Sequence, residues 1–115
     1  MIIGAHTILF STNAEADRAF IGDVLKFSSV DGGGGWLILA APPTDIAVHP
    51  SDENDRHEFY LMTDDLGSEM TRLAAAGVAC DPVIEERWGS LTRIALPGGG
   101  RLGLYQPKHP LAFKR

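Results

Sequence analysis

The chain has 115 residues and a mass of 12.4 kDa, with 44% hydrophobic and 22% charged positions, which suits one domain with a buried core. Ten Lys and Arg residues against fifteen Asp and Glu give a formal net charge of -5, which argues against nucleic acid or an anionic membrane as a partner. The single cysteine, Cys80, excludes an internal disulfide, and the longest apolar run is too short to span a bilayer. We therefore expect a soluble, cytoplasmic protein.

The first half of the chain predicts a strand, a helix and then three short strands. Residues 6–10 form an apolar run rich in β-forming side chains. A helix capping box at Thr12 and Glu15 then precedes apolar residues at four-residue intervals, which predict a helix from about 13 to 25. The three short strands are expected at 27–30, 36–40 and 45–49.

An acidic connector at 51–58 separates this half from a second one with the same order of elements. A strand is expected at 57–62. The helix after it can be capped by Asp64 or Asp65, and Gly77 supplies the left-handed residue that ends it. The remaining strands are expected at 83–87, 91–96 and 101–105.

The repeated order predicts an α+β fold of two tandem βαβββ modules in a single domain. The modules are expected at about 5–50 and 57–107, followed by a C-terminal tail at 108–115. One helix covers only one face of a curved, mainly antiparallel sheet. The uncovered faces of the two modules are therefore expected to surround a shared cavity.

Strand alternation selects the side chains that face this cavity. It places His6 on the same face as Phe10, and His57 on the same face as Phe59. If the other face of each strand meets the helix, both histidines point into the cavity, one from each module.

These features resemble the vicinal oxygen chelate superfamily, which includes glyoxalases, extradiol dioxygenases and bleomycin resistance proteins. The resemblance rests on the two strand-opening histidines and on a closing segment with a Trp-Gly turn, a glycine-rich hairpin and the last strand. It implies a metal site with ligands from strands one, four, five and eight. His6 and His57 hold two of these positions, whereas Ala47 and Gly103 hold the other two and lack ligand side chains.

A third imidazole could complete such a site. His49 lies two residues beyond Ala47 on the same strand face, although the acidic loop after it also fits a surface turn. His6, His49 and His57 would suit Fe, Mn, Ni or Zn and would leave positions open for two vicinal oxygens of a substrate. No nucleotide cofactor is expected, because neither glycine run precedes a helix.

Aromatic side chains are the candidate substrate-binding residues. Tyr105 on the last strand can donate a hydrogen bond to a bound oxygen, while Trp36 and Trp88 can stack on a flat ligand at the rim. Phe10 and Phe59 share the faces of the two histidines. The competing interpretation is that these aromatic residues belong to the hydrophobic core.

Two functions follow, and both use a small molecule as substrate or ligand. The first is a metal-dependent lyase, isomerase or dioxygenase acting on a compound with vicinal oxygens. The second is a metal-free protein that binds and sequesters an antibiotic or another aromatic molecule, as bleomycin resistance proteins do. The paired histidines favour the enzyme, and the missing carboxylates favour the binding protein. For either function, the resemblance and the exposed sheet edges predict a homodimer.

Overall fold

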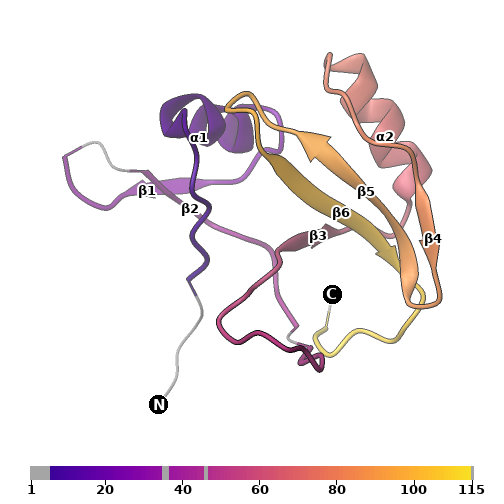
Figure 1. Ribbon diagram of the computed structural model, residues 1–115. Helices are drawn as coiled ribbons and strands as arrows, with labels where there is room; N and C mark the ends of the chain where they lie inside the picture. Colours follow the sequence, from indigo (N-terminus) through magenta and orange to yellow (C-terminus); the bar gives the residue numbers. More distant parts are fainter. Residues whose placement is uncertain (1–5, 35–36, 46, 115) are drawn as a thin grey trace.

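The computed structural model describes residues 6–34, 37–45 and 47–114 (Figure 1). Its elements in chain order are α1 (Ala14–Asp23), β1 (Ser29–Asp31), β2 (Leu37–Leu39), β3 (Tyr60–Met62), α2 (Leu66–Ala75), β4 (Ile84–Glu86), β5 (Gly89–Ala95) and β6 (Arg101–Pro107). They form a two-stranded sheet, β1-β2, and a four-stranded sheet in the order β3-β6-β5-β4. The predicted α+β class is confirmed. Within these ranges no helix is long and apolar enough to cross a bilayer.

The second half of the chain has the predicted order of strand, helix and three strands. β6 is central in the sheet, parallel to β3 and antiparallel to β5, while β4 pairs with the other edge of β5. Gly103 on β6 lies opposite Tyr60 on one side and opposite Arg93 on the other. This row of three residues across the sheet positions the candidate site described below.

The ends of α2 follow local sequence signals. The Asp65 carboxylate caps the helix by accepting hydrogen bonds from the backbone N–H of Ser68 at 3.0 Å and from its hydroxyl at 2.8 Å. These bonds lower the pKa of Asp65. Gly77, with a φ of 79°, follows the helix in the left-handed conformation. Gln106 on β6 accepts a hydrogen bond from the Leu66 N–H at 2.9 Å and so fixes the helix start against the sheet.

Both helices pack on the same face of the four-stranded sheet, so α1 from the first half covers strands from the second half (Figure 1). The buried cluster comprises Phe20 and Ile21 from α1, Leu66 and Leu73 from α2, and Ile94, Leu96, Leu102 and Leu104 around the β5–β6 hairpin. Alternation along β5 and β6 sends the intervening side chains to the opposite face. We call this opposite side the open face; it carries Tyr60, Met62, Leu91, Arg93, Gly103 and Tyr105.

The first half departs from the predicted module. Its helix is confirmed, but the strands predicted at 6–10 and 45–49 are wrong, because the described residues of both segments belong to no strand. A strand needs a hydrogen-bonded neighbour, and these segments pair with none in the described chain. Phe10 is consequently 95% exposed. The first half contributes only the antiparallel pair β1-β2, with Ser29 opposite Leu39.

The two halves are joined at the glycine-rich turn between β5 and β6. Asp17 on α1, only 8% exposed, accepts a hydrogen bond from the Gly98 N–H at 2.7 Å. The Thr12 hydroxyl donates to the Gly98 carbonyl at 2.9 Å. Both backbone groups of Gly98 are thus bound by the first half, and Asp17 gains the partner that a buried carboxylate requires.

We expect Gly98→Ala to lower the free energy of unfolding by about 1–3 kcal/mol, because overfilled sites force neighbours apart. A Cβ at 98 would lie 2.5 Å from Ser11 Oγ and 2.7 Å from Asp17 Oδ2. Gly100→Ala is the matched control, since its Cβ would meet nothing within 4 Å. Urea unfolding followed by circular dichroism measures the stability of both variants. Equal unfolding midpoints for the two variants would contradict the role of Gly98 in joining the two halves.

Candidate functional site

The candidate site is an aromatic cluster on the open face. Tyr60 on β3, Trp88 in the turn before β5 and Tyr105 on β6 meet edge to face, with ring centroids 5.3 to 6.2 Å apart. Edge-to-face contacts of this kind stabilise aromatic pairs. Tyr105 is 8% exposed and forms the base of the cluster, whereas Trp88 is 39% exposed. The indole is therefore available to a flat ligand.

Two glycines make room for the two tyrosine rings. A Cβ at Gly103 would overlap Cδ1 of Tyr60 and lie 2.8 Å from its Cε1, so the Tyr60 ring lies directly on the Gly103 backbone. A Cβ at Gly89 would lie 2.9 Å from Cδ2 of Tyr105 and 2.8 Å from the Gln106 carbonyl oxygen. Glycine inside a strand often marks such a close approach, and here it determines where both rings can lie.

The hydroxyl of Tyr60 lies among charged groups. It donates a hydrogen bond to Glu58 Oε2 at 2.6 Å. This bond, together with burial and the negative charge of Glu58, raises the pKa of Tyr60, while the nearby guanidinium of Arg93 acts in the opposite direction. The pKa of Tyr105 is also raised, first by burial and then by the charge of Asp45. Both phenols are therefore neutral hydrogen-bonding groups at neutral pH.

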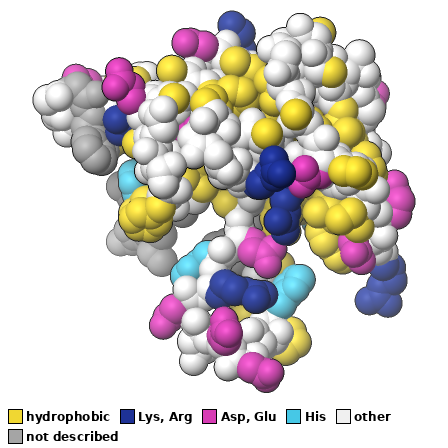
Figure 2. Space-filling view, turned by 45° about the horizontal axis from the view of Figure 1, so that its top comes forward, with side chains coloured by type: hydrophobic (Ala, Val, Ile, Leu, Met, Phe, Trp, Pro, Cys, Tyr) yellow, Lys and Arg dark blue, Asp and Glu magenta, His cyan; other side chains and the backbone are white. Residues whose placement is uncertain are grey.

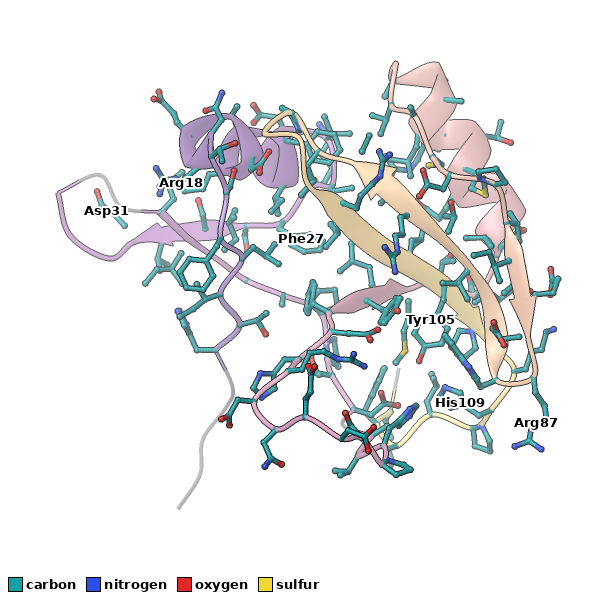
Figure 3. All side chains as sticks on the ribbon, viewed as in Figure 1. Arg18, Phe27, Asp31, Arg87, Tyr105 and His109 are labelled. Atoms are coloured by element: carbon teal, nitrogen blue, oxygen red, sulfur yellow. The ribbon has the colours of Figure 1, made fainter. Side chains whose placement is uncertain are left out.

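The C-terminal tail closes one side of the cluster. The Lys108 N–H donates to the Trp88 carbonyl at 2.9 Å, and its ammonium pairs with Glu85 at 2.9 Å. Tyr105 and His109 then lie together at the end of β6, with the phenol oxygen 3.1 Å from His109 Nε2 (Figure 3). Nδ1 of His109 is 2.7 Å from the Pro110 carbonyl, which can only accept. Nδ1 therefore donates to this carbonyl, and in the neutral ring Nε2 accepts a hydrogen bond from the Tyr105 hydroxyl.

The structure distributes the predicted substrate-binding residues over several places. Tyr105 and Trp88 belong to the cluster. Phe59, expected beside the cavity, packs against the hydrophobic core instead, and Phe10 lies on the surface. Trp36 lies outside the described residues. Sequence reasoning missed Tyr60, Arg93 and His109, because only strand register and the path of the tail place them at the site.

The three histidines are not brought together. His6, His49 and His57 are all exposed, and the described part of the chain contains no group of three His, Cys, Asp or Glu side chains that could hold a metal ion. Strand register explains why His57 is not opposite Gly103. His57 precedes β3, and Tyr60 is the residue that β3 places opposite Gly103. Gly103 offers no ligand and the Tyr60 ring covers its backbone, so the residues at this position do not fit a metal centre.

The sequence matches no protein-family model and no curated protein sequence. Among solved structures it is similar to TnmS3, an antibiotic binding protein from Streptomyces sp. CB03234, at 25% identity and a TM-score of 0.65 over 94% of this chain and 100% of that chain. A lactoylglutathione lyase from Agrobacterium tumefaciens is 17% identical, with a TM-score of 0.59 over 90% of this chain and 92% of that chain. A glyoxalase/bleomycin resistance protein/dioxygenase superfamily member from Sphaerobacter thermophilus is 22% identical, with a TM-score of 0.61 over 91% and 98%.

The raised pKa values of the cluster give a direct test, because the chain contains only two tyrosines. We expect both phenols to ionise above their ordinary value of 10.0 when absorbance is followed during alkaline titration. The neutral phenols favour the folded state, so this stability is present below pH 10 and is lost as the pH rises through the folded-state values. Glu58→Gln removes a charge and should lower the Tyr60 midpoint alone. Ionisation of both tyrosines at their ordinary pKa in the folded protein would contradict the burial and hydrogen bonding described for the cluster.

Proposed function

Because the chain has the fold of the glyoxalase/bleomycin resistance protein/dioxygenase superfamily, we propose that it binds a flat aromatic small molecule without using a metal ion. One observation carries the proposal. The ring of Tyr60 lies on Gly103, the position where the sequence resemblance implies a metal-binding carboxylate. An aromatic surface takes the place of a ligand oxygen there.

The chemistry of the cluster supports binding of an aromatic molecule. The half-exposed indole of Trp88 offers a surface for stacking, and its edge contacts with Tyr60 and Tyr105 hold it in place. Their O–H groups already donate to Glu58 and His109, so the phenol oxygens can accept hydrogen bonds that orient the ligand. The similarity to TnmS3, an antibiotic binding protein, favours the same class of function.

A homodimer is part of this proposal. Hydrophobic side chains are exposed in several places on the face shown in Figure 2. In the first half, Ile8, Phe10 and Val48 are 63%, 95% and 92% exposed. A two-stranded sheet such as β1-β2 has little stability by itself. Pairing with a second copy would cover these side chains and would complete a binding cavity over the open face.

Ligand binding can be measured with N-phenyl-1-naphthylamine, a neutral aromatic probe whose fluorescence rises in an apolar site. We expect the probe to bind the wild-type protein, with no effect of a metal chelator. Trp88→Ala should weaken binding about tenfold because a stacked aromatic pair is lost, and Trp88→Phe should retain most of it. Absence of binding would contradict the proposal, as would chelator-sensitive turnover of a catechol, a diol or a hemithioacetal.

The dimer is tested by sedimentation equilibrium at micromolar concentration. We expect twice the chain mass of 12.4 kDa for the wild type. Phe10→Asp should give a monomer, since it places a charge where an exposed aromatic side chain is to be covered. Val83→Asp introduces the same charge at a 42% exposed residue of the second half and should leave the dimer intact. A monomeric wild type would contradict this part of the proposal.

A further inference from the structure

Arg93 lies beside the aromatic cluster. Binding of a neutral ligand would leave its positive charge without a role. It lies on the open face of β5, opposite Gly103, whose other neighbour is Tyr60. Adjacent strands are about 4.8 Å apart, so the backbones of Arg93 and Tyr60 are about 10 Å apart across a residue with no side chain. The Tyr60 ring and the Arg93 side chain therefore share the space above Gly103.

The charge of Arg93 has no carboxylate partner. Within the described part of the chain, no Asp or Glu lies within 4 Å of its guanidinium. The nearby Glu58 accepts the Tyr60 hydrogen bond and lies 3.7 Å from Arg56. By contrast, the Arg72 guanidinium is 3.0 Å from Glu69. Arg93 is exposed and its guanidinium is hydrogen-bonded to Tyr60, so a positive charge lies beside the aromatic rings with no described carboxylate in contact with it.

The geometry points to Arg93 as the residue that makes this site selective for flat aromatic anions, such as aromatic carboxylates, sulfonates or acidic phenols. The inference rests on the proposed binding function and deepens it by naming the ligand class. The rings of the ligand stack on Trp88, and Tyr60, whose ring is inclined at 70° to the indole with its centroid 6.2 Å away, contacts their edge. Its anionic group then receives hydrogen bonds from the guanidinium fork, which matches a planar or tetrahedral oxyanion.

The position of Tyr60 strengthens this assignment. Its hydroxyl is oriented by Glu58 and is close enough to Arg93 for the guanidinium to favour the ionised phenol. Glu58 outweighs Arg93 at the Tyr60 hydroxyl and raises its pKa, so the oxyanion of a ligand must meet the guanidinium on the side away from Glu58. Tyr60 thus links the stacking surface at Trp88 to the cation at Arg93.

Two probes with the same rings test the inference. 8-Anilinonaphthalene-1-sulfonate is N-phenyl-1-naphthylamine with one added sulfonate, so the difference in their affinities reports the anion alone. We expect the sulfonate to bind the wild type about tenfold more tightly than the neutral probe, and added salt to reduce only the sulfonate affinity. Arg93→Gln should abolish the difference by weakening the sulfonate alone, and Arg93→Lys should keep part of it.

Arg87→Gln is the matched control. Arg87 lies at the turn between β4 and β5, and its side chain points away from the sheet (Figure 3), so its removal should change neither affinity. Equal affinities of the wild type for the two probes, or equal weakening of both by Arg93→Gln, would overturn the inference while leaving the proposed function intact. Failure of the wild type to bind either probe would overturn the proposed function itself.

Discussion

The contact between the Tyr60 ring and the Gly103 backbone is the constraint on which the character of the open face depends. Parallel pairing of β3 with β6 sets these two residues opposite each other, and the missing side chain at 103 lets the ring approach the central strand closely. From there the ring reaches Trp88 and Tyr105, and its hydroxyl reaches Glu58. One absent Cβ thereby turns a position suited to a ligand oxygen into part of an aromatic surface.

A second glycine connects this face to the rest of the molecule. Gly98 in the β5–β6 turn uses both of its backbone groups to bind Asp17 and Thr12 from the first half. Leu96 and Leu102, on either side of that turn, belong to the same buried cluster as Phe20 on α1. The helix of the first half thus completes the core on one side of the second half's sheet, opposite the face that carries the aromatic cluster.

Features that depend on residues close together in the sequence are predicted better than features that depend on the pairing of strands. The two helices, the Asp65 cap and the Gly77 stop follow from local periodicity and capping, and the structure confirms them. The strands expected at 6–10 and 45–49 have a suitable composition, but strand formation also needs a partner that composition cannot reveal.

Prediction of the site is limited by the same dependence on pairing. Trp88 and Tyr105 could be identified from their residue type, whereas Tyr60 could not, because the register that places it opposite Gly103 is a long-range property. Alternation placed Phe59 beside the cavity, but Phe59 packs against the core. His109 lies beyond the last strand, where no periodic pattern predicts that the tail turns back to Tyr105.

The most direct measurement is a nuclear Overhauser experiment on the labelled protein, which reports protons within about 5 Å of each other through space. Because the Tyr60 ring rests on Gly103, strong cross-peaks are expected between the Gly103 α protons and the ring protons of Tyr60. Their absence, with cross-peaks from the Gly103 α protons to the imidazole of His57 instead, would restore the histidine to the cavity and contradict the aromatic, metal-free site.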